Sequence, residues 1–159
     1  GRAEDIQWML DAVPNKHNGL TFCAGSFSAG EHKDCVAMAK QFADRTHFVH
    51  LRSCYIFPNG NFTEASHLGG RGHLIELCRI FEKAEQEGKC NSGRRLPMRV
   101  DHGMTFTDEP GGVFDESNHG HNAGYTLLGR MFAMGQIQGV IATVDDELGI
   151  EYKQPGFYD

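Results

Sequence analysis

The segment His47-Phe48-Val49-His50-Leu51-Arg52 decides the fold class. Its apolar residues are those of a short buried strand, and the strand ends in side chains that can bind or react. Two further apolar runs have the same design, so we expect three strands whose carboxyl ends meet at a common site. These runs are Leu20-Thr21-Phe22-Cys23 and Leu96-Pro97-Met98-Arg99-Val100, the latter followed by Asp101-His102-Gly103.

The segments between and around these strands have apolar residues at helical spacing, which predicts helices there. Three glycines, Gly129, Gly135 and Gly139, weaken the last of the expected helices unless they permit close packing. The order strand, loop, helix recurs about three times, which predicts parallel strands joined by helical crossovers. The expected helices cover residues 5–13, 34–42, 74–87 and 124–140, and residues 103–122 form a long polar loop.

Two α/β architectures fit this order, a doubly wound sheet and a (β/α)8 barrel. The recurrence of chemically useful residues at every strand end favours the barrel, in which the active site is built from those ends. We therefore expect residues 1–159 to form a single unit, about three βα units of a TIM barrel. A closed barrel needs eight strands, so this unit is expected to be part of a larger domain.

Composition excludes several classes of protein. The chain has 159 residues, 23% of them charged, and a formal net charge of −6. Its lysines and arginines are scattered, which argues against a nucleic-acid surface and favours a small-molecule partner. No stretch looks like a membrane span or a signal peptide, so we expect a cytoplasmic protein with no membrane partner. Five cysteines without CxxC pairing are expected to be reduced thiols.

Cys23, His50 and Asp101 stand at three consecutive strand ends. A thiolate, an imidazole and a carboxylate can converge on one divalent ion, with a softness that suits manganese, iron, cobalt or zinc better than calcium or magnesium. Two structural alternatives remain open at this point. Cys23 could be a small buried apolar residue, and Asp101 could cap a helix.

The remaining candidates have specific roles. Arg52 lies on the same side of its strand as His50 and could hold a substrate carboxylate, although a surface arginine is the simpler interpretation. His102 could transfer a proton beside Asp101. His47 points to the opposite face from His50 and is expected to be structural. Solvent exposure or loop structure is also the expectation for His67, His73, His119 and His121.

Four motifs together resemble the mannonate dehydratase family. They agree with that family in order and in approximate spacing, and they cover nearly the whole chain. Two departures are Ala123, where the family has proline, and a longer loop over residues 107–121. The motifs are Thr21-Phe22-Cys23-Ala24-Gly25-Ser26, His47 to Arg52, Pro97-Met98-Arg99-Val100-Asp101-His102-Gly103, and Gly124-Tyr125 through Gly129-Arg130.

The resemblance implies a xylose-isomerase-like TIM barrel, of which this chain is the C-terminal portion, and a hydro-lyase activity. That activity converts D-mannonate into 2-keto-3-deoxy-D-gluconate in glucuronate catabolism. The family's Mn²⁺ or Fe²⁺ is held by one Cys, two His and one Asp, and Cys23, His50 and Asp101 match three of these ligands. The other histidine would lie on a strand before Gly1. His102 and Tyr125 would transfer protons, and Arg52 would contact substrate.

Other functions remain open. With one metal ligand missing, the isolated chain is expected to be inactive, and it could act as a non-catalytic metal-binding or assembly fragment. A sugar isomerase on the same barrel is a further alternative. Unpaired strand edges are expected to promote a homo-oligomer.

Overall fold

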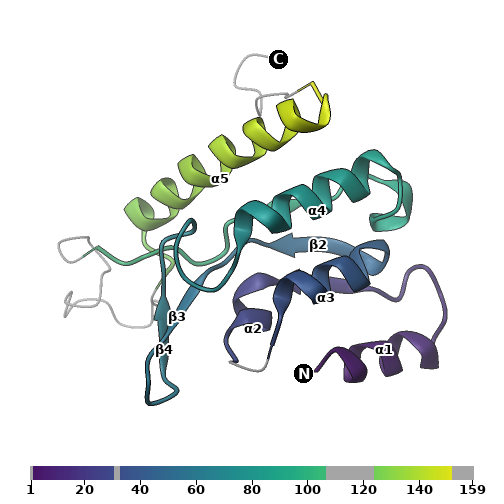
Figure 1. Cartoon of the computed structure of the whole chain (residues 1–159), viewed down its shortest axis with the longest axis horizontal. Helices are drawn as coiled ribbons and strands as arrows, with labels where there is room; N and C mark the ends of the chain where they lie inside the picture. Colours follow the sequence, from purple (N-terminus) through teal and green to yellow (C-terminus); the bar gives the residue numbers. More distant parts are fainter. Residues whose placement is uncertain (1, 31–32, 107–123, 152–159) are drawn as a thin grey trace.

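The computed structural model describes residues 2–30, 33–106 and 124–151. Helices and strands are interspersed along this part of the chain (Figure 1). The helices are α1 (Ala3–Ala12), α2 (Ala24–Ser28), α3 (Cys35–Phe42), α4 (Leu74–Gln86) and α5 (Leu127–Leu148), with short 3-10 turns at Ala43–Arg45 and Asn91–Gly93. The strands are β1 (Leu20–Cys23), β2 (Thr46–His50), β3 (Cys54–Ile56), β4 (Phe62–Glu64) and β5 (Met98–Arg99).

The main sheet contains the three expected strands in the order β1-β2-β5, and both pairings are parallel. The prediction of an α/β fold with parallel strands and helical crossovers is therefore confirmed. Cys23 pairs with His50, and His50 pairs with Arg99, so these three residues form one row across the sheet. In a parallel sheet such a row shares one face, which brings its side chains together.

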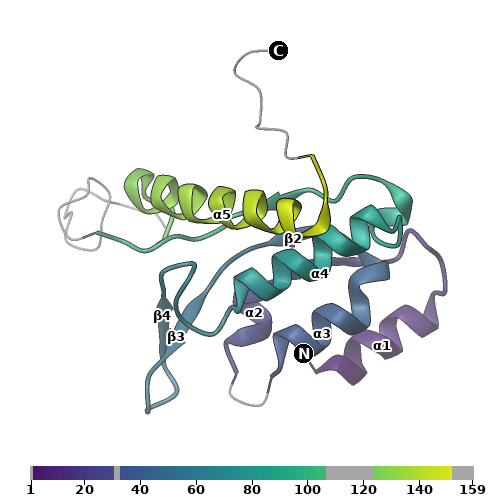
Figure 2. The same ribbon diagram turned by 45° about the horizontal axis from the view of Figure 1, so that its top comes forward.

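The preceding row, Phe22, Val49 and Met98, faces the helices. Phe22 and Val49 are fully buried, and the Phe22 ring meets Phe81 of α4 edge to face at 5.2 Å between centroids. Figures 1 and 2 show α4 between α3 and α5, and both of these helices pack against it. Because side chains alternate along a strand, the row of Cys23 and His50 faces away from the row that packs on α4. The alternation of side chains along each strand thus separates the core from the candidate chemistry.

Helix α5 packs against α4, begins three residues later than expected and extends eight residues past the expected end at residue 140. Gly129 lets its first turn approach the chain after β5, because a side chain there would collide with the Met104 carbonyl. Gly135 and Gly139 have open space around them.

Helix α5 is long and apolar enough to cross a membrane by length and composition alone. A single helix of this kind is weak evidence for a membrane span, because the core helix of a soluble protein passes the same test.

Two features of the fold were not expected, a hairpin and a short helix. The β3–β4 pair forms an antiparallel hairpin in the loop that follows β2, with Cys54 opposite Glu64. Helix α2 starts directly after Cys23. The expected loop over residues 103–122 lies mostly outside the described residues, as do His119, His121 and Ala123.

Candidate active site

Cys23, His50 and Asp101 come together at the carboxyl ends of the three parallel strands. One ligand atom from each, namely a sulfur, an imidazole nitrogen and a carboxylate oxygen, lies within 4.8 Å of the other two. His50 Nδ1 is 3.7 Å from Asp101 Oδ2. Such a cluster of donors is compact enough to share one metal ion, and its composition suits a transition metal.

Asp101 is almost completely buried and has a left-handed backbone, with φ of 53°. Its Oδ1 accepts hydrogen bonds from Arg99 Nη2 at 2.6 Å and from the Tyr125 hydroxyl at 3.1 Å, which leaves Oδ2 toward His50. No helix begins at Asp101 in the described chain, so the capping alternative is wrong. Strained backbone conformations of this kind are common at functional sites.

Burial and the neighbouring charges favour the protonation states in which Asp101 and His50 can bind a cation. Burial alone would raise the pKa of Asp101, but the hydrogen bond from Arg99 and the nearby His102 and His50 outweigh it, so the pKa is lowered. Burial lowers the pKa of His50, and the Asp101 charge opposes that shift only in part. An ionised carboxylate and a neutral imidazole are the states in which these side chains ligate metals.

His102 and Tyr125 lie beside this cluster and against each other. Their ring centroids are 4.4 Å apart in an edge-on arrangement, and the Arg130 guanidinium lies 5.5 Å from the centre of the Tyr125 ring. His102 Nδ1 is 2.9 Å from Glu64 Oε1 at the end of β4. The two residues expected to transfer protons are therefore neighbours, and each is held by a further polar contact.

Arg52 is bound by Glu64 rather than exposed to solvent. Its Nε and Nη2 donate to the two carboxylate oxygens at 2.9 and 2.6 Å, and its guanidinium lies 5.7 Å from the centre of the Phe62 ring. A side chain on Gly25 would collide with Arg52, so this glycine makes room for it. A substrate carboxylate could therefore use only the remaining guanidinium donors.

Of the histidines expected to be structural, the three that the structure describes are not part of the cluster. His47 packs against Gly19 at the start of β1, and His73 is exposed at the start of α4. His67 is buried, with Nε2 2.9 Å from the Val100 carbonyl oxygen, and this burial lowers its pKa. Its bond ties the loop before α4 to the end of the third strand segment.

Two residues that the sequence did not single out make the most polar contacts around the candidates. Glu64 contacts Arg52 and His102, and Arg99 contacts Asp101 and Tyr125. Arg99 could have been found, because it stands two residues before Asp101 in a strand. Glu64 carries no such signal, since it reaches the site only through a hairpin that the sequence pattern did not reveal.

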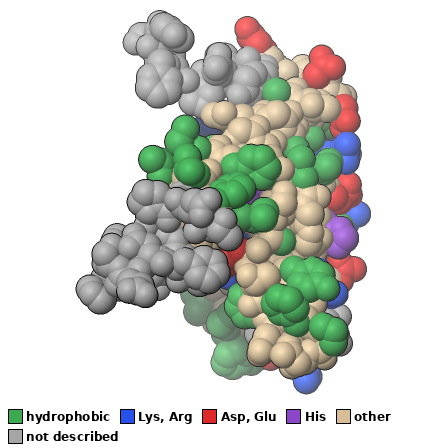
Figure 3. All heavy atoms as spheres, turned by 90° about the vertical axis from the view of Figure 1, so that its left-hand side faces the viewer, with side chains coloured by type: hydrophobic (Ala, Val, Ile, Leu, Met, Phe, Trp, Pro, Cys, Tyr) green, Lys and Arg blue, Asp and Glu red, His purple; other side chains and the backbone are tan. Residues whose placement is uncertain are grey.

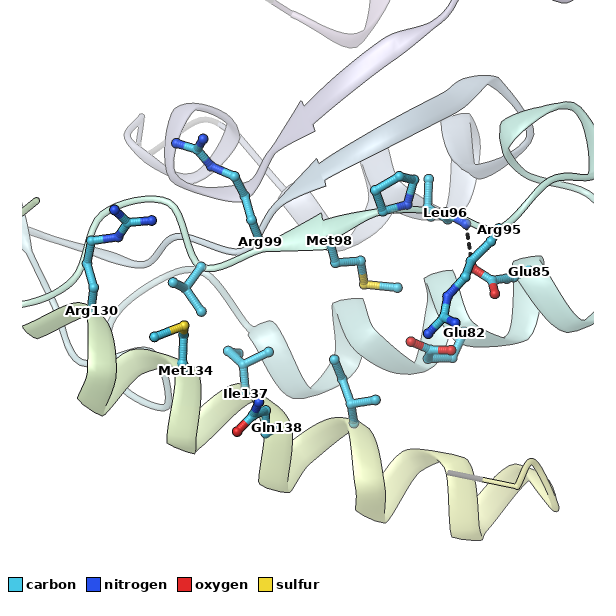
Figure 4. Close-up of a pocket in the computed structure, with 13 residues that line it drawn as sticks. Glu82, Glu85, Arg95, Leu96, Met98, Arg99, Arg130, Met134, Ile137 and Gln138 are labelled. Carbon is cyan, nitrogen blue, oxygen red and sulfur yellow. Dashed lines mark hydrogen bonds between the residues drawn. The ribbon is translucent and has the colours of Figure 1, made fainter. Parts of the chain in front are cut away.

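A cavity of about 430 Å³ lies on the other face of β5, between that strand, α4 and α5. Figure 4 shows Met98 pointing toward the helices and Arg99 pointing away from them. Glu82 and Glu85 of α4 line one end of the cavity beside Arg95. This hollow belongs to the core side of the sheet and not to the candidate active site.

Comparison with known proteins identifies the family. The profile of D-mannonate dehydratase (UxuA) matches residues 1–150. This chain belongs to the D-mannonate dehydratase family. Mannonate dehydratase 2 of Agrobacterium fabrum is 38% identical over 146 residues, covering 91% of this chain and 35% of that protein. The mannonate dehydratase of Saccharophagus degradans is 37% identical over 145 residues, again covering 35% of its length.

The fold agrees with a mannonate dehydratase structure. The crystal structure of the enzyme from Streptococcus suis serotype 2 superposes with a TM-score of 0.73 at 19% identity, over 99% of this chain and 42% of that one. At this level of sequence identity, the structural similarity is evidence for the fold only. The chain spans about a third of the length of these curated mannonate dehydratases, so it corresponds to a fragment of a family member.

Proposed function

We propose that this chain supplies the C-terminal part of a (β/α)8 barrel that dehydrates D-mannonate to 2-keto-3-deoxy-D-gluconate in the cytoplasm, in glucuronate catabolism. The observation that carries the proposal is the convergence of Cys23, His50 and Asp101 within 4.8 Å in a chain of this family. We assign these three residues as ligands of Mn²⁺ or Fe²⁺. A fourth ligand, a histidine, would come from a strand that precedes β1.

The donor set fits such a metal. Thiolate and imidazole ligands are unusual for calcium or magnesium, and three protein ligands leave positions open for a substrate. Asp101 Oδ1 is engaged by Arg99 and Tyr125, whereas Oδ2 faces His50. The bound metal would supply positive charge that stabilises negative charge developing at the substrate carboxylate.

The chain's own residues would handle binding and proton transfer. Arg52 would contact the substrate carboxylate through donors that Glu64 does not use. Dehydration breaks the C–H bond beside the carboxylate and the C–O bond of the next carbon, so one residue must accept a proton and another must donate one. We assign these two roles to the neighbouring pair His102 and Tyr125. Loss of water leaves an enol, which becomes the keto acid.

The test is manganese-dependent conversion of D-mannonate, measured as formation of a 2-keto-3-deoxy acid. The chain is assayed alone and as a chimera in which it replaces the aligned region of the Agrobacterium fabrum relative. We expect activity in the chimera, none in the isolated chain, and none in a chimera that carries Asp101→Asn.

A chimera that folds and binds Mn²⁺ but forms no keto acid would contradict the assignment. Formation of a ketose with a moved carbonyl would point to a sugar isomerase. Metal binding by the chain without turnover in any chimera would favour a non-catalytic metal-binding fragment.

A further inference from the structure

Glu64 connects two parts of the candidate active site that the strands alone do not join. It stands at the end of β4, and only 13% of its side chain is exposed. One carboxylate oxygen, Oε1, is 2.9 Å from His102 Nδ1 and also accepts from Arg52 Nη2. The other oxygen accepts from Arg52 Nε. A single acidic side chain thus contacts a residue expected to transfer protons and one expected to bind substrate.

The chemistry of this contact fixes which nitrogen of His102 carries a proton. An ionised carboxylate only accepts hydrogen bonds, so Nδ1 must be the donor. In a neutral imidazole the other nitrogen, Nε2, then has a free lone pair. Arg52 provides the positive charge that a mostly buried Glu64 carboxylate requires.

The surrounding backbone is built closely around the pair. Gly124 has φ of 91°, and a side chain there would lie 2.9 Å from His102 Cβ and 3.2 Å from Glu64 Cγ. The ring of Tyr125 contacts the His102 ring edge-on. Contacts on several sides hold the imidazole plane, so the Glu64 bond selects an orientation as well as a tautomer.

We propose that Glu64 is a positioning residue, which holds His102 in the Nδ1–H tautomer with Nε2 as the proton-transfer atom and fixes the direction of Arg52. The proposal deepens the proposed function, because it rests on the proton-transfer role of His102. Among the described residues, the side chain of Glu64 forms hydrogen bonds with Arg52 and His102 and with none of the three proposed metal ligands, so its effect should be separable from metal binding.

The direct test is the tautomer of His102, read from long-range ¹H–¹⁵N correlation spectra of the ¹⁵N-labelled chain at one fixed pH. We expect Nδ1 to be protonated in the unaltered chain and to lose most of that protonation in Glu64→Ala. Glu64→Gln keeps a carbonyl oxygen that can accept from Nδ1 and should restore most of it.

His67 is a control within the same spectrum. Its Nε2 faces the Val100 carbonyl oxygen, which can only accept, so His67 should be protonated at Nε2 in every variant. An unprotonated Nδ1 on His102 in the unaltered chain, or a signal that Glu64→Ala leaves unchanged while His67 remains native, would overturn the proposal.

The second readout separates this proposal from the dehydratase assignment. Mn²⁺ affinity of Glu64→Ala should stay within about twofold of the unaltered chain, because the substitution removes no ligand. In the active chimera kcat should fall about 10–100-fold, with partial recovery in Glu64→Gln. If the chimera is inactive but the tautomer changes as expected, the dehydratase assignment fails and the positioning role of Glu64 stands.

Discussion

Asp101 is the most constrained of the three proposed metal ligands, in its backbone, its burial and its contacts. It adopts a left-handed backbone conformation, its side chain is buried, and it contacts Arg99, Tyr125 and His50. A left-handed non-glycine residue costs about 1–2 kcal/mol, and asparagine and aspartate tolerate it better than most residues. The conformation turns the carboxylate toward the row of Cys23 and His50.

Asp101→Asn should weaken Mn²⁺ binding to the chain by at least about 10–100-fold, because it removes the only carboxylate of the three proposed ligands. The amide can keep the backbone conformation, so the fold should persist. Mn²⁺ electron paramagnetic resonance titration measures the affinity, and circular dichroism checks the fold. Asp44→Asn, at an exposed position in the 3-10 turn after α3, is the matched control and should bind like the unaltered chain. Equal affinity in both variants would remove Asp101 from the metal site.

Residues at strand ends could be predicted from sequence because strand alternation and parallel pairing fix where they lie. The structure brings Cys23, His50 and Asp101 together, and it separates His47 from them, as the alternation indicated. The bond between Arg52 and Glu64 could not be predicted in this way. It depends on a hairpin fold that pairs β3 with β4, not on the regular geometry of the main sheet.

At the scale of elements, α5 tests how a glycine acts in a helix. Gly129 and Gly135 lie in the same helix, but only the first approaches other backbone. Gly129→Ala should destabilise the chain by about 1–3 kcal/mol, because the added methyl group collides with the Met104 carbonyl. Gly135→Ala should stabilise it by about 0.5–1 kcal/mol, since alanine loses less backbone entropy. Urea unfolding followed by circular dichroism gives both values, and effects of the same sign would contradict this packing.

The contact between α4 and α5 should make stability depend on pH. Burial, followed by the charge of Asp145, raises the pKa of Glu82 from 4.5 to about 7. A raised pKa means that the folded state holds a proton that the unfolded state releases, so stability declines as the pH rises from about 4.5 to about 7. Glu82→Gln should flatten this decline and raise Tm at pH 8 by roughly 3 °C, or about 1 kcal/mol.

Thermal scans between pH 4.5 and 8 measure that effect. Glu76→Gln is a suitable control, because Glu76 lies on the same helix and pairs with Lys40 and Arg79 at the surface. A Tm that falls more steeply with pH in Glu82→Gln than in the unaltered chain would contradict the raised pKa of Glu82 as the cause.

Helices and strands could be predicted from sequence where the periodic pattern of apolar residues is long or has clear bounds. Strand β1 has the expected bounds, and α4 begins where expected and ends one residue earlier. The strands of the hairpin have three residues each, too few for alternation to be recognised. Helix α5 continues to Leu148 and ends at the left-handed Gly149, although its expected end was residue 140.

The whole molecule leaves apolar surface uncovered. Within the described residues β1 and β5 each pair only with β2, so two strand edges are open. Large apolar side chains are exposed on α1 and at the start of α5, including Trp8 and Leu127, which are 71% and 70% exposed. Figure 3 shows apolar side chains gathered in groups on one face of the molecule. Surfaces of this kind favour association.

The isolated chain should therefore self-associate, as the open edges indicated at the level of sequence. Replacing the exposed Met131 and Phe132 of α5 by glutamate should shift the chain toward monomer in light scattering. Asn59→Asp with Asn61→Asp adds the same charge to the exposed hairpin turn and should leave the association unchanged. A clean monomer for the unaltered chain would contradict the prediction.

The central claim is that Cys23, His50 and Asp101 bind one metal ion at the carboxyl ends of β1, β2 and the β5 segment. Anomalous diffraction from a crystal of the chain grown with Mn²⁺ tests it most directly. The account predicts one strong manganese peak about 2.0–2.4 Å from the Cys23 sulfur, a His50 ring nitrogen and an Asp101 carboxylate oxygen. A peak bound by other residues, or no peak at this cluster, would contradict it.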